Sequence, residues 1–312
     1  MNQPNLLQQW SQDRSTLAAA LTPRAVSVVP ASRRGSSGRS LSGMHWRGPL
    51  IVTAAEALAG SDEARVIWDR GEARAPVVAC DLATDVALLR LPEEPSSGSA
   101  DWGAGDPLIA ADAMLTAGAG VIIVGRGRAG PLVGFGTVRA AGPAWRSRRG
   151  GAIAQRLEFE AGLDARFEGA LVADLAGSAA AMLVAGPRGS LLGIPAATIE
   201  RIVATVEQHG YLPRPYLGLR LQALWLDEPT RTRWGRPART VAAVAGVEPQ
   251  SPAEASGLAP GDLLEAINDI AVDDVEAFAA RLGQSSPGRL VALRLRRGGQ
   301  PQTVEIKVGE WR

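Results

Sequence analysis

Residues able to carry out nucleophilic catalysis are few in this sequence of 312 residues. Such catalysis needs a nucleophile, an imidazole or similar base near neutral pKa, and a carboxylate that orients the base. The sequence holds only one cysteine and two histidines. Cys80 ends an apolar run at 77–80, which is typical of a core residue. His45 precedes a predicted hairpin and His209 ends a predicted helix, so neither is placed in an obvious reactive site.

The composition favours a β-rich protein with about two domains. The 36 Gly and 21 Pro residues, with 46% hydrophobic residues, suit short strands joined by many turns. The formal net charge is +1, and the 33 basic residues are scattered among 32 acidic ones. A nucleic-acid partner is therefore not expected, because no basic stripe could neutralise a phosphate backbone.

The first part of the chain is expected to be a helical extension followed by a β domain. Residues 1–22 are polar and mildly amphipathic, which predicts a helix lying on the body or on a partner subunit. Residues 23–210 are expected to form one domain, with short apolar runs punctuated by Gly, Pro and Asp up to about residue 171. This spacing is typical of a β-barrel or sandwich. A helix is predicted after Pro195, ended by Gly210.

A second, smaller domain is predicted at residues 216–312, after a stiff linker at 211–215 that contains two prolines. Five or so strands and two short helices are expected in it. Residues 259–262 have the composition of a tight turn, and residues 297–300 that of a hairpin.

Several other chemistries are excluded by context. Residues 125–130 fit GxGxxG after a strand, yet Pro131 and another predicted strand follow, where a dinucleotide site requires a helix. The basic run at 145–151 is typical of a solvated hairpin tip. No cluster has metal-ligand spacing, and no cofactor is expected.

No leader and no apolar run of membrane-spanning length occurs. The chain as written is thus expected in the cytoplasm, or in the periplasm if a leader was removed.

The second domain resembles the PDZ domain of the HtrA family. The resemblance rests on motifs that keep the family's order and spacing over nearly the whole of 216–312: Tyr216-Leu217-Gly218-Leu219, Ser251-Pro252-Ala253, Gly257-Leu258, Pro260-Gly261-Asp262 and Ile267-Asn268. It implies that the backbone amides around the first motif bind the C-terminal carboxylate of a peptide, which adds as a strand beside the sheet. Gly218 suits this role because amides converge on an anion only where no bulky side chain blocks it.

The same resemblance implies an apolar pocket for the peptide side chains. We expect it to be lined by Leu219 and Leu221 on the strand and by Phe278 and Leu282 on the helix. For Phe278 and Leu282, a plain core role is an equally good interpretation.

From about residue 22 to 206 the sequence resembles, more weakly, the protease body of the HtrA family, which implies a trypsin-like double β-barrel. The family's histidine position is taken by Glu56, and its aspartate position by Asp85. Its serine position is taken by Phe167, or by Glu168 with a one-residue shift. No catalytic triad is therefore intact on this alignment.

These replacements predict loss of peptide hydrolysis by the usual route. A glutamate with an ordinary pKa of about 4.3 is a poor base for a serine hydroxyl at neutral pH. Arg166 and Phe167 replace the glycines that shape the family's oxyanion hole. Losing Ser or His in such a protease costs on the order of 10⁶ in kcat.

Three functions remain as hypotheses. The first is an inactive HtrA-like homologue that binds peptides, unfolded segments or protein C-termini, as scaffold, adaptor or regulatory subunit. The second is an active serine endopeptidase of protein quality control that uses Ser178, because residues 177–184 also resemble a small-residue turn before Leu-Val. The third is a structural subunit of a homotrimer or of a hetero-oligomer with active relatives.

Overall fold

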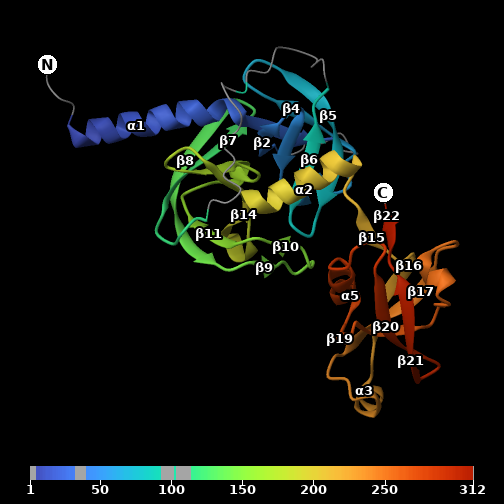
Figure 1. The fold of residues 1–312 in the computed structure, drawn as a ribbon. Coiled ribbons are helices and arrows are strands. Elements are labelled where there is room, and N and C mark those ends of the chain that lie inside the picture. Colours follow the sequence, from blue (N-terminus) through green and yellow to red (C-terminus); the bar gives the residue numbers. More distant parts are fainter. Residues whose placement is uncertain (1–4, 32–39, 93–101, 103–113, 312) are drawn as a thin grey trace. The chain divides into compact units, whose positions relative to one another are not determined.

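The computed structural model describes residues 5–31, 40–92, 102 and 114–311. The chain divides into two compact units, which are described separately. Unit 1 holds residues 1–145 and 153–212, and unit 2 holds residues 146–152 and 213–312. Strands dominate both units (Figure 1), so the predicted all-β-dominated fold class is confirmed.

The first six strands of unit 1 close into a barrel in the order β1-β2-β3-β6-β5-β4. Almost every residue of β1, β2 and β3 is buried, so burial does not alternate along these strands. The strands are β1 (Ala25–Pro30), β2 (Leu41–Arg47), β3 (Leu50–Thr53), β4 (Glu63–Ile67), β5 (Glu72–Asp81) and β6 (Val86–Arg90), with the short 3-10 helix η2 (Glu56–Leu58) after β3.

The second barrel of unit 1 runs in the order β11-β14-β13-β12-β7-β8. Residues 125–130 form the end of β7, a tight turn and the start of β8, which confirms that this glycine motif opens no helix. The strands are β7 (Gly120–Gly127), β8 (Gly130–Gly142), β11 (Arg156–Glu160), β12 (Leu171–Asp174), β13 (Ala179–Ala185) and β14 (Leu191–Pro195). The short elements are η3 (Ala165–Phe167), η4 (Pro187–Gly189) and the paired strands β9 (Trp145–Arg146) and β10 (Ala152–Ile153).

Two helices accompany the barrels. Helix α1 (Leu6–Leu21) begins with a capping box at Asn5 and leads through η1 (Thr22–Arg24) into β1. Helix α2 (Ala196–His209) buries the predicted apolar stripe and ends at Gly210, whose φ of +81° is the left-handed conformation expected there. Glu200 and Glu207 on α2 both bind the guanidinium of Arg47 at the end of β2. These ion pairs hold α2 against the first barrel.

Ser42 on β2 joins the two barrels. Its hydroxyl donates to the carbonyl of Arg166 at 2.7 Å and accepts from the amide of Arg126 at 3.1 Å. Its amide donates to the carbonyl of Glu168 at 2.8 Å, and its carbonyl accepts from the hydroxyl of Thr53 at 2.7 Å. One fully buried serine thus ties β2 to β7, to η3 and to the residue that follows η3.

The centre of unit 2 is a sheet in the order β16-β17-β18-β20-β21, with β19 paired to β18. Strand β16 lies at one edge. The strands are β16 (Leu219–Trp225), β17 (Thr240–Val247), β18 (Leu263–Ile267), β19 (Ile270–Ala271), β20 (Leu290–Arg297) and β21 (Gln300–Lys307), and a separate pair joins β15 (Arg214–Tyr216) to β22 (Gly309–Trp311).

Three short helices complete unit 2. They are α3 (Glu228–Trp234), α4 (Pro252–Ala255) and α5 (Val275–Leu282). Helix α5 is capped by Asp274 and packs its Phe278 into the core with the apolar face of the sheet.

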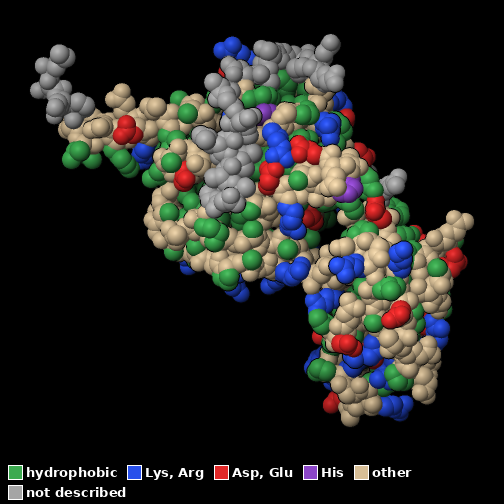
Figure 2. Space-filling view, viewed as in Figure 1, with side chains coloured by type: hydrophobic (Ala, Val, Ile, Leu, Met, Phe, Trp, Pro, Cys, Tyr) green, Lys and Arg blue, Asp and Glu red, His purple; other side chains and the backbone are tan. Residues whose placement is uncertain are grey.

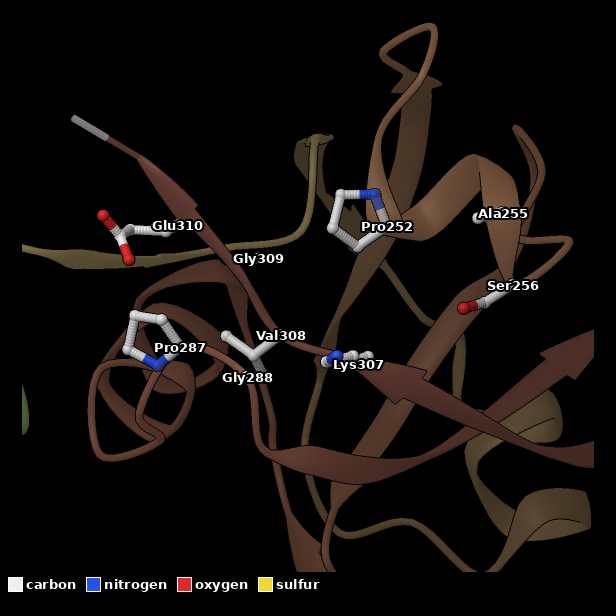
Figure 3. Close-up of a pocket in the computed structure, with 9 residues that line it drawn as sticks. All are labelled: Pro252, Ala255, Ser256, Pro287, Gly288, Lys307, Val308, Gly309 and Glu310. Atoms are coloured by element: carbon white, nitrogen blue, oxygen red, sulfur yellow. The ribbon is translucent and has the colours of Figure 1, made fainter.

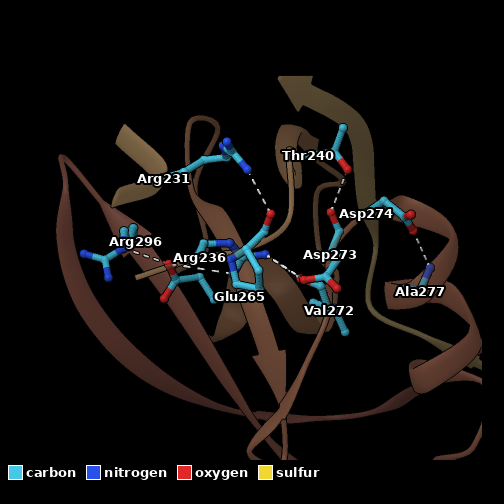
Figure 4. A network of polar contacts seen from close by, with 10 residues as sticks. Arg231, Arg236, Thr240, Glu265, Val272, Asp273, Asp274, Ala277 and Arg296 are labelled. Carbon is cyan, nitrogen blue, oxygen red and sulfur yellow. Dashed lines mark hydrogen bonds and ion pairs between the residues drawn. The ribbon is translucent and has the colours of Figure 1, made fainter. Parts of the chain in front are cut away.

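The connection that contains α3 is held by buried charges (Figure 4). The side chain of Arg236 is 10% exposed and donates to the carbonyl of Val272. Glu265, 7% exposed, accepts from Arg296 at 2.7 Å, and Arg296 lies over the ring of Trp234. Glu265 therefore has two arginines around it, which compensates the desolvation of a carboxylate in the sheet.

A Gly169→Ala substitution tests the junction of the barrels. Gly169 has φ +81°, and an added Cβ would lie 2.2 Å from the backbone oxygen of Ser42 and 2.7 Å from Thr53 Oγ1. We expect a loss of about 3 kcal/mol or more in the free energy of unfolding, measured by urea denaturation. Gly162→Ala is the control, because its Cβ would meet nothing within 4 Å. Equal stability of the two variants would contradict the role given to this contact.

Candidate functional site

Glu56 and Asp85 are brought together by the pairing of β3 with β6. Thr53 lies opposite Ala87 in this pair, so the residues that follow β3 meet the residue that precedes β6. The backbone amide of Glu56 donates to Oδ1 of Asp85 at 2.8 Å. Asp85 has φ +59°, in the left-handed region that aspartate and asparagine tolerate best after glycine. Asp85 thereby caps the first turn of η2.

Asp85 lies among carboxylates. The pKa of Asp85 is raised to about 6, first by burial and then by the negative charges of Glu56 and Glu168, whereas hydrogen bonds from the amides of Glu56 and Ala55 lower it. The structure therefore places two other sequence-predicted positions, Glu56 and Glu168, within electrostatic reach of Asp85. Three carboxylates offer neither a hydroxyl nucleophile nor an imidazole base.

Phe167 lies elsewhere: its side chain is 7% exposed and belongs to the core of the second barrel. The backbone around it is also committed to internal hydrogen bonds. Asp164 accepts from the amide of Arg166 through its side chain and from the amide of Phe167 through its carbonyl. The amide of Gly169 donates to Leu183, so these three amides are not available to an oxyanion.

The histidines do not complete this site. His45 is 9% exposed, stacks on Trp102 at 4.4 Å and contacts the carbonyl of Gly48 through Nε2, and burial lowers its pKa. His209 Nδ1 contacts the carbonyl of Thr205 at the end of α2. Within the described ranges, neither ring has a hydrogen bond to a carboxylate.

Ser178 and Cys80 also lie outside any such constellation. Ser178 lies in the turn between β12 and β13, where its amide donates to Oδ1 of Asp174 and its carbonyl accepts from the amide of Asp174. Cys80 is half-buried on β5, with its Sγ 3.7 Å from the carbonyl oxygen of Ala55. No group of three or more His, Cys, Asp or Glu side chains suited to a metal ion occurs in the part of the chain that is described.

In unit 2, the loop at 216–219 has the geometry of an anion-binding turn. Gly218 has φ +78°, and an added Cβ would lie 2.2 Å from Cβ of Ser251. The carbonyls of Leu217 and Gly218 accept from the amides of Ala253 and Glu248, both at 2.9 Å. Among described residues, the amides of Leu217 and Gly218 donate to no acceptor. Carbonyls turned inward and unused amides are what a carboxylate-binding loop requires.

The side chains of this loop have separate structural roles. The hydroxyl of Tyr216 donates to Glu248, which raises its pKa, and its ring packs on Trp311. The side chain of Leu217 is 2% exposed and belongs to the core. A peptide could therefore meet Leu217 only through its backbone.

The predicted pocket residues flank the open edge of the sheet. Leu219 and Leu221 on β16 and Leu282 on α5 are half-buried against the core, and Phe278 is 2% exposed and forms part of it. On the same helix, Val275 also packs against the core, whereas Ala279 is exposed.

A separate hollow of about 550 Å³ lies on unit 2 (Figure 3). Its lining comes from α4, residues 287–288 and the end of β21 with β22, and includes Lys307 and Glu310. None of the predicted pocket residues lines it. The open edge of β16 is therefore a different surface from this hollow.

Two family models match the chain. A model described as trypsin-like peptidase domain matches residues 41–182, and a model described as PDZ domain matches residues 215–308. They correspond to the two barrels and to the sheet of unit 2. The chain belongs to the HtrA/Deg-type family. The two barrels of this HtrA/Deg-type chain are the trypsin-like pair, and its C-terminal sheet is the PDZ domain.

Curated relatives of this HtrA/Deg-type chain are proteins named "Probable periplasmic serine endoprotease DegP-like". The protein from Bartonella henselae is 26% identical over 259 residues, which cover 80% of this chain and 48% of the relative. The protein from Rhizobium meliloti is 27% identical over 260 residues, covering 80% and 49%. The chain thus spans about half the length of the curated relatives it matches.

Solved structures show the same fold. An HtrA-type protease, AlgW, with a decapeptide matches with a TM-score of 0.60 at 19% identity, covering 96% of this chain and 98% of that one. The serine endoprotease from Yersinia pestis matches with a TM-score of 0.61 at 20% identity, covering 96% and 98%. None of the described helices in this family member is long and apolar enough to cross a membrane.

An Asp85→Asn substitution tests the electrostatics of the carboxylate group. Between pH 4 and 6 the folded chain keeps a proton on Asp85 that the unfolded chain has released, so this group's contribution to stability falls as pH rises. Asparagine keeps the acceptor for the Glu56 amide without the charge. We expect the variant to be more stable by about 1–2 kcal/mol at pH 7.5, with the gap closing toward pH 4.

Urea denaturation across this pH range measures the effect. Asp13→Asn, which changes an exposed carboxylate on α1, is the matched control. Its free energy of unfolding should follow that of the wild-type protein across this pH range. If the free energies of unfolding of wild type and Asp85→Asn changed in parallel with pH, this would contradict the burial of Asp85 beside other negative charges.

Proposed function

We propose that this HtrA/Deg-type chain binds peptide C-termini and exposed hydrophobic segments without hydrolysing them. The observation that carries the proposal is the company of Asp85, whose charged neighbours are the carboxylates of Glu56 and Glu168, while both histidine rings contact backbone carbonyls elsewhere. The amides used internally around Phe167 support it, since an acyl-transfer site needs free donors for the oxyanion.

Peptide binding is assigned to the PDZ domain. Its loop offers the amides of Leu217 and Gly218, and β16 is an edge strand whose backbone can pair with an added strand. The apolar residues Leu219, Leu221 and Leu282 favour a hydrophobic terminal side chain. The related fold of AlgW, solved with a decapeptide, supports the same mode.

The chain would then act as a scaffold, an adaptor or a regulatory subunit. Leu6, Leu7 and Trp10 on α1 are 85%, 75% and 59% exposed, and Figure 2 shows hydrophobic side chains along this helix. Such a row favours contact with another subunit, in a homotrimer or with an active relative. The names of the curated relatives favour the periplasm as its location.

The alternative, a working endopeptidase, would have to use Ser178. We expect a fluorophosphonate probe to leave the chain unlabelled and casein to stay intact, because no base is placed to activate that hydroxyl. Mass spectrometry of the treated protein and gel analysis of casein measure this. Covalent labelling that disappears in Ser178→Ala would establish the alternative.

Binding through the terminal carboxylate is tested with two forms of one peptide. We expect a decapeptide that ends in valine to bind the chain at least tenfold more tightly as the free acid than as the amide, by fluorescence anisotropy. Leu221→Glu should weaken binding of the acid form, because it places a charge in the apolar pocket. Leu224→Glu, on the opposite face of β16, is the control.

Equal affinity of acid and amide, or no binding of either, would contradict the proposed carboxylate loop.

A further inference from the structure

The open edge of β16 continues beyond Leu219 and Leu221. Trp225, at the far end of this strand, is 66% exposed. Side chains alternate along a strand, so Trp225 shares the face of Leu219 and Leu221, which lies toward α5. An exposed tryptophan on this face has no part in the core of the domain.

The register fixes where Trp225 lies relative to α5. Trp225 pairs with Thr240 on β17, and the hydroxyl of Thr240 donates to the carbonyl of Asp273, just before α5 begins. The indole is therefore next to the N-terminal end of α5, whereas the carboxylate loop lies at the other end of β16.

Two exposed acidic side chains lie near the N-terminal end of α5. Glu276 is exposed in the first turn of α5, and Asp273 is 58% exposed beside it. Two arginines are also near: Arg236 is only 10% exposed and lies 3.4 Å from Asp273, and Arg239 is the exposed residue just before β17. Residues 270–280 contain no lysine or arginine.

We propose that the PDZ groove selects C-terminal peptides that carry a lysine or arginine upstream of the hydrophobic terminal residue. This proposal rests on the proposed peptide-binding function. A peptide antiparallel to β16 would bring a side chain about four to six residues before its end to Trp225. A cation there would lie on the indole face and near Glu276, which is an interaction that neither a neutral nor an acidic side chain can make.

The experiment compares decapeptides that end in valine with a free carboxylate, in which lysine or norleucine occupies each of the three upstream positions in turn. Norleucine keeps the apolar stem of lysine and removes the charge. We expect lysine at one position to tighten binding to the full chain about three- to tenfold, measured by fluorescence anisotropy. Trp225→Ala should abolish this preference and Glu276→Gln should reduce it.

Leu224→Ala is the matched control, because Leu224 is also exposed but lies on the other face of β16. It should keep the preference for lysine. Equal affinity for lysine and norleucine peptides that do bind would overturn the upstream selectivity and leave the peptide-binding function standing. Failure of every free-acid peptide to bind would instead overturn the proposed function.

Discussion

The contact of Ser42 with η3 and the residue after it is the constraint on which the body of the protein depends. Through its amide, carbonyl and hydroxyl, one buried residue of the first barrel binds Glu168, Thr53 and Arg166. This contact fixes Glu168 near the junction of the barrels, and the pairing of β3 with β6 fixes Glu56 and Asp85 there. The fold therefore brings three chain segments together, as is typical of a two-barrel protease. This arrangement does not depend on which side chains those segments carry.

The two halves of the chain differ in how well their chemistry is preserved. In the body, the converging positions hold carboxylates, and the backbone around Phe167 satisfies its own amides. In the PDZ domain, the loop at 216–219 keeps amides without acceptors among the described residues, beside an open strand edge. The proposed function in recognition rests on this division of features.

Much of this could be predicted from the sequence. The helix that ends at Gly210, the PDZ motifs and the hairpin at 125–130 follow from local patterns, because periodicity and turn residues act over a few positions. The role of Ser42 could not be predicted, since its partners Arg126 and Arg166 lie more than 80 residues away in the chain. The raised pKa of Asp85 and the exposure of Trp225 likewise depend on which segments the fold brings together.

The central claim, recognition without cleavage, is tested most directly by native mass spectrometry of the chain after prolonged incubation with a peptide that ends in a hydrophobic residue. The account predicts a complex whose ligand retains the mass of the intact peptide and a protein without a covalent adduct. Peptide fragments, or an acyl adduct on Ser178, would contradict it.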